Sequence, residues 1–173
     1  MGTLTVREAR SEDLETLCRL YHEFHQFHAA GVPDRLLELG AEPAFDEAPN
    51  LQDALRGIIA SEDAALFVAE TDETVIGFAE VYRREDPTAR LRIAHPFGLL
   101  QSLYVQADRR RAGVGRALTG AAMSWARARG ATEMRVDTWE FPEGPVGFYE
   151  AQGYRTLRRT MVRGLENEEE PPG

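Results

Sequence analysis

Hydrophobic and polar residues follow two patterns along the chain: short apolar or alternating runs typical of strands, and longer segments with a helical period. The short runs predict strands at 4–7, 65–70, 74–83, 97–105, 133–138 and 154–163. The helical segments lie at 11–30, 51–60, 113–129 and 144–152. The resulting order is β-α-α-β-β-β-α-β-α-β, which predicts a single domain of the α/β (α+β) class.

The ends of these segments carry recognisable signals. Ser11 has the character of an N-cap, and the break at 31–34 contains a glycine and a proline that should end the first helix. A second, less regular segment is expected at 36–45, and a turn at 71–73 should join two strands into a hairpin. Gly130 is the natural C-cap of the long third helix.

The length and net charge of the chain limit the number of domains and the classes of partner it can have. The chain has 173 residues and a formal net charge of −9, from 20 basic and 29 acidic side chains. We expect one domain at 1–165 and a disordered acidic tail at 166–173. This charge disfavours nucleic acid as a partner and favours a cationic substrate. The chain shows no membrane-spanning run and no signal peptide at 1–10, and its single cysteine, Cys18, fits a reducing cytoplasm.

The stretch from Gln101 to Ala121 carries the strongest chemical pattern. An apolar strand is followed by three consecutive arginines and then by Gly113-Val114-Gly115, which opens an alanine-rich helix. Glycines at a helix start let a ligand approach the free backbone N–H groups, and the helix dipole favours an anion there. Three cations would oppose the dipole at this point unless an anion is bound. The segment therefore predicts a cradle for a phosphate or pyrophosphate group.

The same residues exclude several phosphate ligands. A dinucleotide fingerprint needs a third glycine where Leu118 stands. All 20 basic residues are arginines, so the chain lacks both the lysine of a Walker A loop and a lysine for a Schiff base with pyridoxal phosphate.

The pattern that remains is Arg/Gln-x-x-Gly-x-Gly/Ala, present from Arg110 to Gly115. Together with the preceding strand and the segment from Pro145 to Tyr154, it resembles the acetyl-coenzyme A motif of the GNAT (GCN5-related) N-acetyltransferases. The resemblance covers nearly the whole chain before the tail. It implies a mixed central sheet flanked by helices, acetyl-CoA as co-substrate and an amine as acceptor. The residues expected to bind the coenzyme are Leu103, Tyr104, Val105, Arg110, Arg111, Ala112, Gly113, Val114, Gly115, Arg116 and Phe148.

Tyr149 is the candidate general acid. In the family the corresponding tyrosine protonates the departing coenzyme thiolate, and the alternative is an aromatic that packs a short helix onto the sheet. The chain departs from the family pattern nearby, because Pro142 and Pro145 stand where asparagine and alanine are common. The side-chain contact of that asparagine to the coenzyme is therefore missing, and the substitution is expected to reshape the acceptor pocket around Phe141.

The general base has several candidates. An aliphatic amine is mostly protonated at pH 7, so a base or a chain of waters must remove its proton. Glu80, in the middle of a strand, is the first candidate, against the alternative of a solvated carboxylate on a strand. Asp137, Glu140 and His95 are others, and ordered water is a further option.

The first helix supplies further candidates. His25 and His28 lie on its apolar stripe, and we expect them to line the acceptor site together with Gln101 and Phe141. The segment from His22 to His25 is one residue short of a zincin motif, so no metal is expected.

These features predict an acetyl-CoA-dependent N-acetyltransferase that acts directly on a primary amine of a small molecule or peptide. A coenzyme A-binding sensor without catalysis, or an acyltransferase for larger acyl groups, are the alternatives. No nucleic-acid or membrane partner is expected, and the resemblance implies a homodimer.

Overall fold

The computed structural model describes residues 2–40 and 49–165. It contains a five-stranded sheet in the order β1-β2-β3-β4-β5, and these strands are β1 (Thr5–Glu8), β2 (Ala64–Thr71), β3 (Thr74–Glu85), β4 (Pro96–Val105) and β5 (Glu133–Val136). The first four strands are antiparallel neighbours, and β5 is parallel to β4. The predicted mixed sheet and fold class are confirmed.

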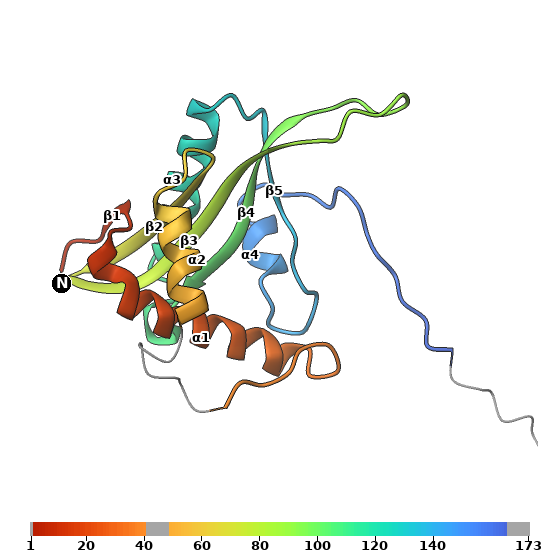
Figure 1. The fold of residues 1–173 in the computed structure, drawn as a ribbon. Helices are drawn as coiled ribbons and strands as arrows, with labels where there is room; N and C mark the ends of the chain where they lie inside the picture. Colours follow the sequence, from red (N-terminus) through yellow and green to blue (C-terminus); the bar gives the residue numbers. More distant parts are fainter. Residues whose placement is uncertain (1, 41–48, 166–173) are drawn as a thin grey trace, which may run out of the picture.

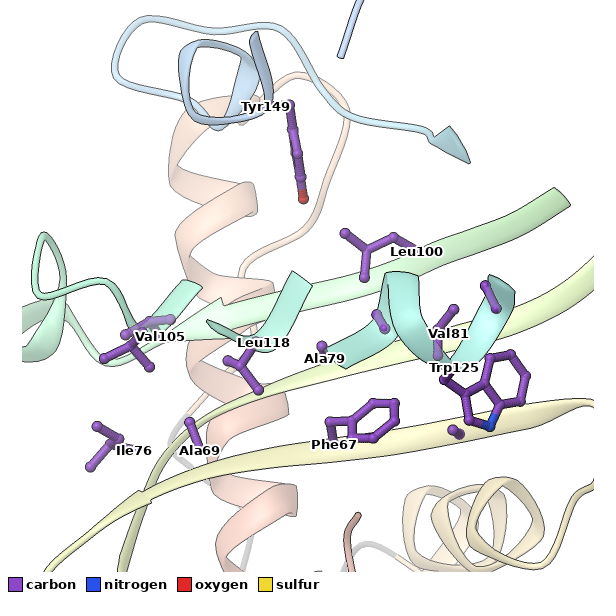
Figure 2. Close-up of a cluster of buried hydrophobic side chains, with 14 residues drawn as sticks. Phe67, Ala69, Ile76, Ala79, Val81, Leu100, Val105, Leu118, Trp125 and Tyr149 are labelled. Carbon is purple, nitrogen blue, oxygen red and sulfur yellow. The ribbon is translucent and has the colours of Figure 1, made fainter. Parts of the chain in front are cut away.

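Helices cover both faces of this sheet (Figure 1). On one face, α1 (Leu14–Gly31) and α2 (Pro49–Ile59) bury a cluster built around Leu17, Leu20, Leu55 and Phe78. On the other face, α3 (Val114–Ala128) and the short α4 (Val146–Glu150) bury a second cluster. Leu118, Trp125, Val81 and Tyr149 belong to that second cluster (Figure 2). Side chains of β3 enter both clusters, so both faces of this strand are buried.

Most element boundaries fall close to those the sequence predicts. The hairpin between β2 and β3 turns at Asp72 and Glu73, both with positive φ. The helix α3 ends before Gly130, whose φ of +82° fits the predicted C-cap. The first helical turn differs from the prediction. Residues Ser11–Asp13 form a 3-10 turn in which the Asp13 carboxylate, not Ser11, accepts from the backbone N–H of Arg10.

Two predicted segments are not formed as expected. The strand predicted at 154–163 is absent from the part of the chain that the structure describes, where these residues run as an exposed extended segment beyond α4. The prediction was wrong here because its strand-like pattern gives no information about which edge would pair with it. The irregular segment predicted at 36–45 is without regular structure over 36–40, and the rest of it, like the acidic tail at 166–173, lies outside the described residues.

The sheet opens between β4 and β5. Their register runs only from Phe97–Glu133 to Leu100–Val136, so the last five residues of β4 lie beyond the end of β5. At the same point the β3–β4 register shifts by one residue, since Glu80 pairs with Ser102 and Val81 with Leu100. Gln101 is the extra residue of this bulge. The bulge and the short β5 together leave one edge of β4 available at the carboxyl end of the strand.

Candidate active site

A cleft of about 560 Å³ lies at this opening. The carboxyl-terminal residues of β4, from Gln101 to Val105, form one wall. The other walls come from the end of α1, the start of α3, the end of β5 and α4. A parallel pair of strands that separates at its carboxyl ends presents backbone donors and acceptors to whatever enters between them.

The start of α3 gives one side of the cleft the character of an anion site. Gly113 is the N-cap of α3 with φ of +83°, a conformation that glycine adopts readily, and a Cβ at this position would meet open space. Arg111 also has a positive φ, so the loop turns its backbone sharply before the helix. Among the basic side chains, those of Arg110, Arg111 and Arg116 line the cleft. Free N–H groups, the helix dipole and three guanidinium groups therefore act together on any bound anion.

Arg110 is held in place by contacts within the protein. Its Nε donates to the carbonyl oxygen of Val105 at 3.0 Å, at the end of β4. Its guanidinium lies 4.7 Å from the centre of the Phe27 ring and 5.5 Å from that of Tyr104. These contacts connect the cradle to α1 and hold the side chain along the wall of the cleft.

Tyr149 reaches the cleft from α4. Its side chain points from the helix toward the sheet, with the hydroxyl toward β4 near Leu100 (Figure 2). The residue is only 7% exposed yet lines the cleft. Burial, followed by the neighbouring Tyr154, raises the pKa of the Tyr149 phenol well above its usual value. The phenol therefore keeps its proton at neutral pH and can donate a hydrogen bond to an anion in the cleft.

The position of α4 follows from close packing against α3. A Cβ on Gly115 would lie 3.0 Å from the Phe148 ring, so the two helices approach at a residue without a side chain. Thr119 on α3 donates to Gln152 at 2.6 Å just beyond α4. Pro145 is the N-cap of α4, and its carbonyl accepts from the N–H groups of Phe148 and Tyr149. The proline therefore starts the helix that carries Tyr149, at a position where its fixed φ is suitable.

Phe141 closes the wall between α1 and the β5–α4 loop. Its ring lies 6.2 Å from that of His28 and 5.6 Å from that of Phe27. A Cβ on Gly31 would overlap this ring, so the end of α1 accommodates Phe141 only because glycine is there. Phe141 does not itself line the cleft but supports His28, which does.

Glu80 lies outside the cleft. Its environment differs from both expectations, that of a general base in the cleft and that of a solvated carboxylate on a strand. The side chain is 6% exposed, so it is not a solvated carboxylate. It accepts from the hydroxyl of Tyr21 at 2.7 Å and from that of Tyr82 at 2.6 Å. Burial and the Glu80 charge raise the pKa of both phenols, which therefore remain donors to the carboxylate. Across the strands Glu80 pairs with Ser102, which does line the cleft.

The remaining predicted residues divide between the cleft and its surroundings. The cleft is lined by nine of the predicted coenzyme-binding residues, Leu103, Tyr104, Val105, Arg110, Arg111, Gly113, Gly115, Arg116 and Phe148, and by Gln101, His28 and Asp137. Val114 is buried in the core, Ala112 is exposed, and neither lines the cleft. His25 also lies outside it and contacts the carbonyl of Leu37 at 2.7 Å. Glu140 and His95, the other candidate bases, do not line it either.

Sequence reasoning missed two parts of the cleft. Phe24 and Phe27 contribute an aromatic surface from α1, and Glu143 and Gly144 come from the loop before α4. The phenylalanines belong to the same helical stripe as His28, so the helical period could have found them. The loop residues carried no comparable signal, because their position depends on where Phe141 packs.

Two groups with their own chemistry are absent from the site. Cys18 is buried in the cluster between α1, α2 and the sheet, and burial raises the pKa of its thiol. No group of three or more potential metal ligands occurs within residues 2–40 and 49–165.

No helix of the described chain has the length and apolar character needed to cross a membrane.

An anion cradle at a helix start, a splayed pair of parallel strands and a tyrosine over the gap are features of an acyl-coenzyme A-binding transferase. The model of the acetyltransferase (GNAT) family matches residues 15–154. The chain belongs to this family of N-acetyltransferases.

Curated relatives match only part of the chain. An aminoglycoside N(6′)-acetyltransferase type 1 of Stenotrophomonas maltophilia is 33% identical over 59% of this chain and 65% of its own length. The enzyme of the same name from Klebsiella aerogenes is 40% identical over 49% of this chain and 54% of its own length. The chain thus spans less than two thirds of these relatives.

Solved structures share the fold over nearly the whole chain. A variant of the BH1408 protein from Bacillus halodurans has a TM-score of 0.82 at 21% identity, over 93% of this chain and 99% of that one. The aminoglycoside N-acetyltransferase AAC(6′)-Iy, solved with a bisubstrate analogue of coenzyme A, has a TM-score of 0.71 at 21% identity, over 94% of this chain and 98% of that one.

Proposed function

We propose that the protein transfers an acetyl group from acetyl-CoA directly to a primary amine of a small cationic molecule. The observation that carries this proposal is the free edge of β4 at Gln101–Val105, which lies between the anion cradle of α3 and Tyr149. One surface can therefore hold a long ligand that has an anionic end and a reactive end. The aminoglycoside acetyltransferases among the relatives support an amine of this kind.

The residues of the cleft fit the coenzyme. The N–H groups at the start of α3 and the side chains of Arg111 and Arg116 would hold its pyrophosphate. The edge of β4 offers backbone groups to the amide-containing arm. When bound, acetyl-CoA would supply the activated acetyl group as a thioester.

Tyr149 would then donate a hydrogen bond to the departing thiolate. A thiol has a pKa of about 8.5, far below that of a buried phenol, so the donation is a hydrogen bond that stabilises developing negative charge. Cys18 lies in the other core cluster, which argues against an acyl-cysteine intermediate and for direct transfer.

The acceptor side of the cleft has the opposite charge from the cradle. Asp137 and Glu143 line it and are both exposed, while no lysine or arginine other than those at 110, 111 and 116 belongs to its described lining. Two carboxylates would attract a cationic substrate, and Asp137 would accept a proton from its amine, directly or through water. With Glu80 outside the cleft, Asp137 becomes the preferred base.

A screen of amines by thiol release tests this proposal. The panel comprises aminoglycosides, polyamines, amino-acid amides and a peptide with a free amino terminus, with a monocationic amino sugar as a control for charge. We expect turnover with di- or polycationic amines, and a KM that rises at least fivefold in Asp137→Asn for these but not for a monocation. Turnover confined to the peptide would contradict the small-molecule acceptor.

A further inference from the structure

The helix α4, which carries Tyr149, is only five residues long. A helix of this length is not stable by itself, because its first turn fixes several backbone dihedral angles for a single hydrogen bond. Its position over β4 therefore depends on contacts with the rest of the protein. This position matters for the chemistry, because a hydroxyl displaced by about 1 Å from its acceptor no longer makes a hydrogen bond of ordinary length.

Two contacts join this region to α3. In the first, the Phe148 ring lies against Gly115, where a Cβ would lie 3.0 Å from the ring. In the second, the hydroxyl of Thr119 donates to the side-chain oxygen of Gln152 at 2.6 Å. Gly115 and Thr119 are four residues apart, so both contacts lie on the same face of α3. In the sequence, Tyr149 lies between the two residues that make these contacts from the side of α4.

Thr119 is only 1% exposed, and its hydroxyl has a choice of acceptors. The oxygen lies 2.6 Å from Oε1 of Gln152, 3.0 Å from the Gly115 carbonyl and 3.1 Å from the Arg116 carbonyl. A hydroxyl has one proton to donate, and the shortest of the three contacts is the one that crosses to Gln152. The amide nitrogen of Gln152 lies 3.5 Å from the carbonyl oxygen of Phe148, which orients the amide oxygen toward Thr119. The apolar contact of Phe148 limits how closely the helices approach, whereas this bond also fixes a direction between them.

Gln152 connects this bond to Tyr149 through the main chain. Its backbone N–H donates to the Tyr149 carbonyl at 2.9 Å, and the N–H of Tyr154 donates to the same carbonyl at 3.1 Å. The Tyr154 ring also packs on the Tyr149 ring, with 5.4 Å between the centroids. The side chain of Gln152 is thus anchored on α3, while its main chain holds the residue whose hydroxyl points toward β4 (Figure 2).

We propose that Thr119 and Gln152 are positioning residues, whose hydrogen bond sets where the Tyr149 hydroxyl lies relative to the anion cradle. Gly115 lines the cleft at the start of α3, and Thr119 lies about one turn further along the same helix. A single rigid element thereby places both ends of the coenzyme, the pyrophosphate at its N-terminus and the sulfur, through Gln152, at Tyr149. The proposal rests on the proposed function, because that function assigns Tyr149 the hydrogen bond to the thiolate.

Kinetics with Thr119→Val test this role, because valine has nearly the size of threonine but no hydroxyl. We expect kcat to fall at least fivefold and the KM for acetyl-CoA to stay within twofold, since the cradle residues are unchanged. Gln152→Met, at a half-buried position, should reproduce this split, and it carries the test if the valine variant does not fold. Thr119→Ser keeps the hydroxyl and should retain at least half of the parental kcat. A kcat of Thr119→Val equal to that of the parent would overturn the proposal.

Two comparisons separate positioning from a loss of stability. Tyr21→Phe removes a buried hydrogen bond on the other face of the sheet, so it controls for destabilisation and should keep its kcat. In a Tyr149→Phe background, Thr119→Val should change kcat less than twofold, because the hydroxyl that Thr119 positions is gone. A fivefold loss both with and without the phenol would show that Thr119 acts on the fold as a whole, which contradicts a positioning role.

Binding of free coenzyme A supplies a readout that needs no acceptor amine. Calorimetry compares its dissociation constant at pH 7 and pH 9 with that of an analogue lacking the sulfur, which shares every phosphate contact. The coenzyme thiol ionises at about pH 8.5, so a phenol that donates to the thiolate should strengthen binding of coenzyme A relative to the analogue at pH 9. We expect a gain of at least threefold in the parent and in Thr119→Ser, and of less than 1.5-fold in Thr119→Val and Tyr149→Phe.

The binding experiment also distinguishes a failure of this proposal from a failure of the proposed function. A gain in the parent that is lost in Thr119→Val supports the positioning pair even if no amine of the panel is acetylated, a result that would contradict only the acetyl transfer. An equal gain in the parent and in Thr119→Val would overturn the positioning pair and leave the acetyl transfer untouched.

Discussion

The tyrosines on the two faces of the sheet differ in the hydrogen-bond partners of their hydroxyl groups. On the α1 face, the hydroxyls of Tyr21 and Tyr82 both donate to Glu80. On the α3 face, Tyr149 lines the cleft, and the hydroxyl of Tyr154 is buried without a partner among the described residues. All four phenols have a raised pKa caused first by burial. A shared pKa shift therefore does not identify the reactive group, and what separates Tyr149 from the others is that its proton faces a space for a ligand.

The largest effect is expected from Tyr149→Phe. The variant keeps the ring that packs against α3 and the sheet but removes the hydroxyl that we expect to donate to the thiolate. We expect kcat to fall at least 100-fold, within the range typical of a lost proton donor, and the affinity for acetyl-CoA to change less than threefold. Steady-state thiol release and calorimetry measure the two quantities. Unchanged kcat at saturating substrate would assign Tyr149 a packing role only.

Tyr21→Phe should lower the free energy of unfolding and leave kcat largely unchanged. The ring stacks on Phe78 with centroids 4.1 Å apart, and phenylalanine keeps that contact. The lost hydroxyl leaves a buried carboxylate with one donor fewer, which should lower the free energy of unfolding by about 2 kcal/mol. Urea denaturation measures this value, with Tyr82→Phe as the partner variant. A large loss of kcat in a stable Tyr21→Phe protein would instead indicate that Glu80 takes part in catalysis.

The pH dependence of turnover separates the acceptor amine from the phenol. Because burial raises the pKa of Tyr149, its phenol stays protonated from pH 7 to pH 9, whereas an aliphatic amine with a pKa of about 10 loses its proton progressively. Turnover at subsaturating amine should therefore rise by up to about tenfold per pH unit in this range. A fall above pH 8 in a protein that remains folded would indicate an acid with an ordinary pKa.

The smallest effect is expected from Tyr154→Phe. The hydroxyl of Tyr154 is buried and has no hydrogen-bond partner in the described structure, so its removal relieves a desolvated polar group. The free energy of unfolding should stay the same or rise by up to about 1 kcal/mol. Thermal unfolding beside the Tyr21→Phe protein checks the contrast, and equal destabilisation of the two would show that the Tyr154 hydroxyl has a partner in solution.

The sequence predicts the order of elements well because most of them are specified locally. Gly113 and Gly130 take the positive φ that their positions at the ends of α3 require, and the hairpin turn falls at Asp72 and Glu73. The cradle could be located for the same reason, since its function depends on consecutive residues. Tyr149 could be proposed only through the resemblance of its segment to a family motif.

What could not be predicted depends on contacts between distant segments. The burial of Glu80 follows from the approach of Tyr21, 59 residues away along the chain. The position of His28 in the cleft depends on Phe141 reaching the end of α1. The strand predicted at 154–163 has a suitable pattern but pairs with no strand of the described sheet. A pattern indicates that a residue can take part in an element, and the partner comes only from the fold.

Calorimetric titration with acetyl-CoA tests the central claim most directly, with free coenzyme A and ATP as comparison ligands. The parent chain should bind both coenzyme forms with micromolar affinity and ATP at least 100-fold more weakly. Gly113→Glu should abolish binding, because its carboxylate would extend into the open space where a phosphate is expected, while Gly113→Gln, with the same size and backbone strain but no charge, should bind within about tenfold of the parent. A folded Gly113→Glu protein that binds acetyl-CoA as tightly as the glutamine variant would contradict the cradle and, with it, the assignment of the cleft.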